Sequence, residues 1–120
     1  MNSVIIANQE SIKKAEEKGL NNYQEKFSCK ITVLKCEFNS ELYIKYPYGM
    51  ASKCGRLEEG QEFKTNSRWD PPVGFCIWAW RDLIPSIHSF HEGREIPSIS
   101  CCTDGLRPVT FKLEKVDVVE

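Results

Sequence analysis

The feature that most constrains the fold of this chain is a regular alternation of apolar and polar residues near its C-terminal end. Within residues 107–116, three apolar positions alternate with three polar ones: Val109, Phe111 and Leu113 against Thr110, Lys112 and Glu114. Successive side chains of a strand point to opposite faces, so this pattern predicts a strand with one face buried. Residues 98–103 form a second predicted strand, and the intervening Asp104-Gly105 pair predicts a tight antiparallel turn.

A longer strand is predicted over residues 27–38. Every second residue from Phe27 to Val33 is apolar, which places these side chains on one face. The next apolar residues, beginning with Leu34, fall in the opposite phase. This slip predicts either a bulge or a strand covered on both faces. A short strand is predicted over residues 61–65, after a turn at Gly60.

The strongest helical pattern lies between these strands. The run Asp70-Pro71-Pro72 precedes it and excludes an earlier start, and Pro85 is predicted to kink it or to begin a second turn. Four residues share one face at helical spacing: Cys76, Trp80, Leu83 and Ile87. We therefore predict an α+β fold, a small curved antiparallel sheet or partly open barrel with one main helix, about residues 75–91, packed on it.

The distribution of apolar residues also predicts the domain organisation. The chain has 120 residues, which is enough for one core. A short helix is predicted over residues 8–18, but Ile12 is its only large apolar residue. Residues 1–26 are therefore predicted to be an N-terminal extension, either loosely attached or docked on another subunit of a homo-oligomer. Residues 27–120 are predicted to form a single α+β domain.

Charge and cysteine content narrow the classes of function. Sixteen basic and seventeen acidic residues form no basic stripe, which argues against a nucleic-acid partner. The N-terminus has no basic segment, and its apolar run is too short for a signal peptide or a membrane span. We expect a cytoplasmic protein without a membrane partner. The six cysteines are then expected to be reduced thiols, metal ligands or catalytic groups rather than disulfides.

Two sequence strings carry a resemblance to known proteins. They are F-C-x-W-A-W over residues 75–80 and C-C-x-D-G-L-R-P-V over residues 101–109. Together with Cys54, the segment 30–35 and the G-Q-E-F turn at Gly60, they resemble an uncharacterised family of small prokaryotic cytosolic proteins. The resemblance covers about residues 29–116. It implies a compact cytosolic domain and brings no assigned activity.

The vicinal pair Cys101-Cys102 is the first candidate for chemistry. On a strand, one thiol of such a pair faces the core and the other faces away. Both cysteines could simply pack as small hydrophobic residues. Alternatively, one is a nucleophilic or redox thiol that is activated by Arg107 across the turn. With Cys76, this pair supplies the candidate catalytic residues.

Aromatic and charged neighbours supply candidate ligand-binding residues. Trp78 and Trp80 point about 200° apart on a helix, so one is predicted to pack in the core and the other to line a pocket. Asp104 either caps the turn or contributes to a site. Arg107 either pairs with a carboxylate or binds the carboxylate or phosphate of a ligand. The leading hypothesis is a small-molecule enzyme or binding protein for a ligand that could be anionic.

Two other classes of function remain open. Cys54, Cys76, Cys101 and Cys102 could bind zinc or iron, although no C-x-x-C motif occurs and no cofactor is required. His88 and His91 have a spacing that suits a metal, but solvated residues at a helix end are the favoured interpretation. In the third class, the cysteines only pack and the chain is a structural or protein-interaction module.

Overall fold

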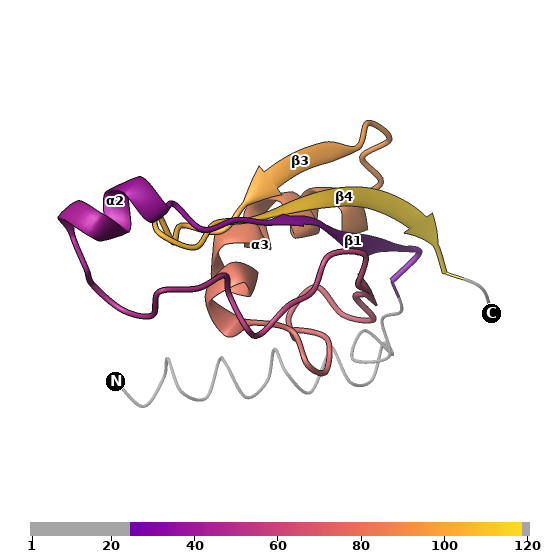
Figure 1. Ribbon diagram of the computed structural model, residues 1–120. Coiled ribbons are helices and arrows are strands. Elements are labelled where there is room, and N and C mark those ends of the chain that lie inside the picture. Colours follow the sequence, from indigo (N-terminus) through magenta and orange to yellow (C-terminus); the bar gives the residue numbers. More distant parts are fainter. Residues whose placement is uncertain (1–24, 119–120) are drawn as a thin grey trace, which may run out of the picture.

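Four strands form an open sheet, and one long helix lies across one of its faces (Figure 1). The computed structural model describes residues 25–118. Its elements are β1 (Phe27–Cys36), α2 (Ser40–Lys45), β2 (Glu62–Lys64), α3 (Ile77–His91), β3 (Ser98–Cys101) and β4 (Val109–Asp117). The strand order is β2-β1-β4-β3, and every neighbouring pair is antiparallel. The predicted α+β fold, with one main helix on an antiparallel sheet that does not close, is confirmed.

The core lies between α3 and the two central strands. Alternate residues of these strands point to the helix and are buried: Cys29, Ile31 and Val33 from β1, and Val109, Phe111 and Leu113 from β4. The intervening residues of β4 include Lys112 and Glu114, which form an ion pair on the opposite face. The alternation in residues 107–116 therefore identified the buried face correctly.

The slip of phase in the first strand is a bulge. Val33 pairs with Phe111 and Lys35 pairs with Thr110, so Leu34 is an extra residue without a partner in β4. Its side chain is exposed, while Cys36 returns to the buried face. One inserted residue thus restores the alternation toward the core.

The helix α3 turns one continuous apolar stripe to the sheet. Its buried residues are Ala79, Trp80, Leu83, Ile87, Phe90 and His91. Pro85 lies inside the helix on its exposed side, so the backbone carbonyl that loses its partner can be solvated. No helix in residues 25–118 is both long and apolar enough to span a bilayer.

The folded domain includes residues that were predicted to belong to the extension. The Glu25 carboxylate contacts Arg68 and His91, and the Lys26 carbonyl accepts a hydrogen bond from the Val118 N–H. The domain therefore begins no later than Glu25. The predicted helix over residues 8–18 lies outside the described residues.

Candidate functional site

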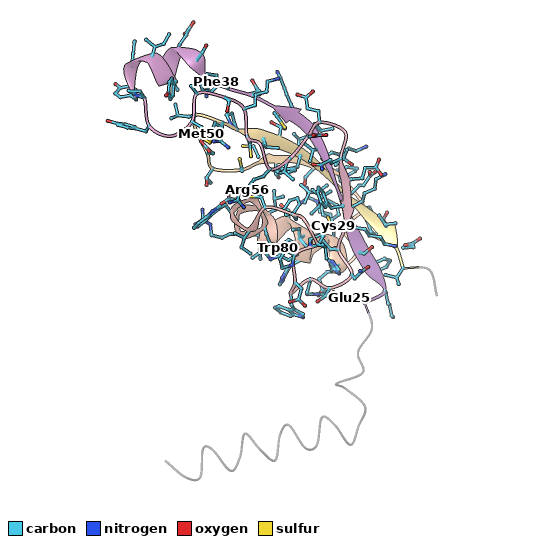
Figure 2. The ribbon with its side chains drawn as sticks, turned by 60° about the horizontal axis from the view of Figure 1, so that its bottom comes forward. Glu25, Cys29, Phe38, Met50, Arg56 and Trp80 are labelled. Carbon is cyan, nitrogen blue, oxygen red and sulfur yellow. The ribbon has the colours of Figure 1, made fainter. Side chains whose placement is uncertain are left out.

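A hollow of about 330 Å³ opens where α3 begins and where the β3–β4 turn folds over the sheet. Three thiols and three guanidinium groups line it: Cys54, Cys76, Cys102, Arg56, Arg81 and Arg107. Figure 2 shows Arg56 beside α3 and well separated from Glu25. The hollow lies at the start of α3, whereas Glu25 contacts His91 at the end of the same helix.

The start of α3 supplies one wall. The helix begins at Ile77, after the proline pair, and Cys76 is its N-cap residue. Ala79 packs against the sheet, which turns Trp78 outward to the rim with an exposed fraction of 60%. The Arg81 guanidinium lies 5.2 Å from the centroid of the Trp78 ring, a cation–π contact that holds the indole in place.

The β3–β4 turn supplies the opposite wall. Asp104 Oδ1 accepts hydrogen bonds from the N–H groups of Leu106 at 3.1 Å and Arg107 at 3.0 Å. This is the turn-capping role that the sequence allowed for Asp104. Asn39, the N-cap residue of α2, makes no capping hydrogen bond through its side chain and donates instead to the Gly105 carbonyl, which fixes the turn from outside.

One carboxylate joins the two walls. Asp82 of α3 accepts hydrogen bonds from the Thr103 N–H at 2.9 Å and the Thr103 hydroxyl at 3.1 Å. Its own side chain is only 10% exposed. Because a charged acceptor with two donors is a strong contact, it holds the turn against the first turns of the helix. The two walls of the hollow are therefore held together by contacts within the protein.

The vicinal thiols point to opposite faces of the sheet, as their alternation predicted. Cys101 pairs with Thr110 on the open face and is exposed. Cys102 packs against the core on the helix side, and its Sγ accepts a hydrogen bond of 3.3 Å from the Val109 N–H. Only Cys102 of the pair reaches the hollow.

The two thiols of β1 are structural. Burial raises the pKa of Cys29 to about 12, and burial also raises the pKa of Cys36, with Glu59 as a secondary cause. The Cys36 thiol donates a hydrogen bond of 3.6 Å to the Leu57 carbonyl. Since a nucleophilic thiol must be accessible and deprotonated, neither cysteine is a candidate for chemistry.

Two predicted site residues lie apart from the hollow. Trp80 is 4% exposed and packs in the core, because it lies on the sheet side of α3 two residues after Trp78. Cys101 lies on the open face of the sheet, opposite to Cys102, and so does not line the hollow. The other predicted residues line the hollow together: Cys54, Cys76, Trp78, Cys102, Asp104 and Arg107.

The four cysteines of the metal-binding alternative are not grouped closely enough within residues 25–118 to hold a metal ion. Cys101 and Cys102 face opposite sides of the sheet, and residues 25–118 contain no group of three His, Cys, Asp or Glu side chains placed to hold a metal ion. The histidine pair is occupied elsewhere: His88 Nε2 lies 2.9 Å from the Arg68 carbonyl, and His91 is buried. The expectation of a solvated helix end is thus wrong for His91.

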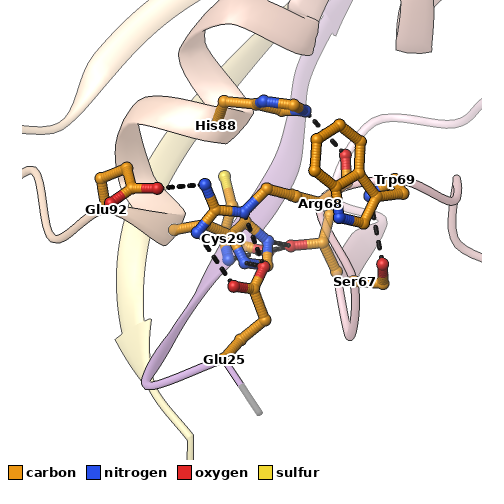
Figure 3. A network of polar contacts seen from close by, with 9 residues as sticks. Glu25, Cys29, Ser67, Arg68, Trp69, His88 and Glu92 are labelled. Carbon is orange, nitrogen blue, oxygen red and sulfur yellow. Dashed lines mark hydrogen bonds and ion pairs between the residues drawn. The ribbon is translucent and has the colours of Figure 1, made fainter. Parts of the chain in front are cut away.

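A network of polar contacts that joins Glu25, Arg68 and Glu92 was missed in the sequence (Figure 3), and it also includes His91. The Arg68 guanidinium donates to both oxygens of Glu25, at 3.0 Å and 2.9 Å, and also pairs with Glu92. His91 Nδ1 lies 2.6 Å from Glu25 Oε2, within ion-pair distance but without hydrogen-bond alignment. His91 Nε2 lies 2.6 Å from Thr65 Oγ1. His91 follows Ile87 by four residues, and this spacing could have placed it on the buried face.

Thr65, His91 and Glu25 are arranged like the nucleophile, base and carboxylate of a catalytic triad, but the role of these three residues is structural. Thr65 borders the second hollow described below, but its side chain has no exposed surface and its hydroxyl is already engaged within the domain. The same hydroxyl accepts a hydrogen bond from the Cys29 N–H and lies within hydrogen-bond distance of the Cys29 carbonyl oxygen. The network therefore ties the end of α3 to β1. A second hollow, of about 510 Å³, opens beside Glu25, and its described lining contains no thiol or guanidinium.

This network predicts a loss of stability in acid. Burial lowers the pKa of His91 below its ordinary 6.5, so the unfolded chain binds more protons just below that pH and the free energy of unfolding falls as the pH decreases. Hydrogen bonds from Arg68 lower the pKa of Glu25 below 4.5, which adds a second loss at lower pH. Urea unfolding at pH 7.5 and pH 5.5 measures the first effect.

The matched variant for this prediction is His91→Asn. It should be less stable at both pH values, but it should show a smaller difference between them because the titrating group is gone. An unchanged pH dependence in His91→Asn would show that other groups cause the acid loss.

Comparisons with protein-family models, with curated proteins and with solved structures find no match to this chain. The assignment of the site therefore depends on its own chemistry.

Proposed function

We infer that this protein binds a small anionic molecule in the hollow between the start of α3 and the β3–β4 turn. The observation that carries this proposal is the state of Arg107. Its Nε is buried and has no hydrogen-bond partner among the residues that the structure describes. A buried donor without a partner lowers the stability of the folded protein by about 1–3 kcal/mol, and by more when the group is charged. An anionic acceptor in the hollow would recover this cost.

The balance of charge in the hollow supports an anion. Asp82 and Asp104 are its two carboxylates, and both accept hydrogen bonds from the β3–β4 turn. Arg81 has a contact of 3.4 Å with Asp82, but Arg56 and Arg107 have no ion pair within residues 25–118. Three guanidiniums therefore face two carboxylates that are already engaged. Guanidinium groups bind carboxylate and phosphate with two parallel hydrogen bonds.

The helix end adds to the same preference. The first turn of α3 contains no acidic residue, and Cys76 makes no capping hydrogen bond through its side chain. The N–H groups and the positive end of the helix dipole are therefore available to negative charge. Trp78 provides an apolar wall beside them, and a volume of about 330 Å³ suits a ligand at the small end of the usual range.

Arg107→Ala is expected to weaken anion binding at least about tenfold, because a hydrogen bond to a charged group contributes about 1.5 kcal/mol or more. Calorimetric titration with inorganic phosphate and with succinate measures the affinity, and erythritol serves as the uncharged comparison. Thermal unfolding of each variant checks that the fold is kept.

The matched control is Arg94→Ala, which removes the same charge outside the hollow, where Arg94 stacks on Phe90. It should bind the anions like the wild type. Arg107→Lys keeps the charge without the guanidinium and should give an intermediate affinity. Equal losses in Arg94→Ala and Arg107→Ala, or no anion binding by the wild type, would contradict the proposal.

A further inference from the structure

The thiols that line the hollow have no role in the proposed binding of an anion. Of the six cysteines, Cys29 and Cys36 are buried in the core, and Cys101 is exposed on the open face of the sheet. The remaining three, Cys54, Cys76 and Cys102, line the hollow with the guanidinium groups. All six are free thiols. A ligand held by the arginines would therefore lie against reduced sulfur.

Cys102 is the best positioned of these three thiols. Its backbone N–H donates to the Val109 carbonyl at 3.1 Å, and the Val109 N–H donates back to its Sγ at 3.3 Å. The sulfur is thus fixed beside a backbone donor. By contrast, the Cys76 side chain makes no hydrogen bond to the helix end, and Cys54 lies in a loop without regular structure.

The surroundings of Cys102 suit a sulfur that carries negative charge. A thiolate is the form that attacks a disulfide, and an N–H donor and nearby cations are the groups that accommodate its charge. Arg107 follows in the same turn, and Arg81 contributes from α3. The same cations would attract a disulfide that carries carboxylates and would align one of its sulfur atoms with Cys102.

We propose that Cys102 undergoes thiol–disulfide exchange with a small disulfide that carries carboxylate groups. This step rests on the proposed anion binding, because the guanidinium groups that hold an anion are the ones that orient the reactant. The negative charge of the small disulfide determines which disulfides react. Of the vicinal pair Cys101-Cys102, only Cys102 is the reactive thiol.

The exchange balances without any further reagent. The Cys102 thiol releases its proton to solvent, and the thiolate attacks one sulfur of the small disulfide. The disulfide bond of the small molecule breaks while a mixed disulfide forms at Cys102. The Cys102 sulfur is oxidised, and the departing sulfur is reduced to a thiolate that takes up a proton. A small thiol that carries a carboxylate reverses the step when it attacks the mixed disulfide at Cys102.

The neighbouring Cys101 is a built-in control. It is adjacent in sequence and more exposed, but it lies on the other face of the sheet and outside the hollow. Accessibility alone would make Cys101 the faster thiol. A preference for Cys102 that depends on the charge of the disulfide can arise only from its surroundings.

The experiment uses three disulfides of similar length: dithiodipropionate with two carboxylates, hydroxyethyl disulfide without charge, and cystamine with two ammonium groups. Reduced full-length protein is mixed with each, and the first adduct is followed by intact mass. Cys101→Ser should keep the first dithiodipropionate adduct, and Cys102→Ser should lose it. Because the guanidinium groups attract the carboxylates, we expect the dithiodipropionate adduct to form at least about tenfold faster than the hydroxyethyl disulfide adduct. Cystamine should react most slowly, because its ammonium groups are repelled.

Arg107→Ala should reduce this rate ratio toward one, whereas Arg94→Ala should preserve it. The proposal is overturned if the first adduct is lost in Cys101→Ser instead, or if the rate does not depend on the charge of the disulfide. Cys102→Ala is the second variant if Cys102→Ser fails to fold. Phosphate binding that depends on Arg107, without selective exchange, would refute this inference and leave the proposed function intact.

Discussion

Phe111→Ala is expected to lower the free energy of unfolding by about 3–5 kcal/mol, a large share of the stability of a domain of this size. Phe111 is fully buried near the start of β4, and the centroid of its ring lies 5.7 Å from that of the Phe75 ring. Truncation removes this apolar contact and leaves a cavity between the central strands and α3, which the backbone of the sheet cannot close.

Urea unfolding of the wild type and Phe111→Ala measures this effect through the change in midpoint at constant slope. Val73→Ala is the control, because the Val73 side chain is fully exposed and its loss should change stability by no more than about 0.5 kcal/mol. A loss below about 1 kcal/mol for Phe111→Ala would mean that α3 does not pack on the sheet as described.

Arg68→Ala is expected to cost about 3 kcal/mol, the lower end of the range for breaking a buried ion pair. The side chains of Arg68 and Glu25 are each only 11% exposed, and two hydrogen bonds join them. Without the guanidinium, the Glu25 carboxylate loses both donors and remains beside His91. The bridge that Arg68 makes between Glu25 and Glu92 would then be lost, and only the Glu25–His91 contact would join the start of the domain to the end of α3.

Glu92→Gln separates this effect from an ordinary surface ion pair. Glu92 contacts the same guanidinium, but its side chain is 68% exposed, so its loss should cost at most about 1 kcal/mol. Thermal and urea unfolding of both variants tests the difference. Equal costs for Arg68→Ala and Glu92→Gln would show that the buried arm of the network contributes nothing. Anion binding at the hollow, which lies at the opposite end of α3, should survive in Arg68→Ala.

Most of the fold was predictable because it depends on local periodicity. The alternation in residues 107–116 is a property of consecutive side chains, and the same face is buried in the structure. The slip at Leu34 predicted either a bulge or a strand covered on both faces, and the register of β1 with β4 shows that it is a bulge. The helical stripe between Trp80 and Ile87 likewise follows from a spacing within one element.

The site was predictable only where the chain itself brings residues together. Cys102, Asp104 and Arg107 belong to one turn, so their proximity needed no tertiary information. Their approach to Cys76 and Trp78 could only be hypothesised, because it depends on how α3 crosses the sheet. Arg56 and Arg81 were missed altogether, since no local pattern marks a charged residue that will border a hollow.

By itself, the sequence determined the antiparallel strands, the main helix and the separation of Cys101 from Cys102, because each follows from the period of a single element. The tertiary structure alone decided which thiols share a hollow with guanidinium groups, and it paired Glu25, Arg68 and His91 across the domain. These contacts join residues far apart in the chain. Their formation depends on the packing of α3 against the sheet, which no short-range pattern encodes.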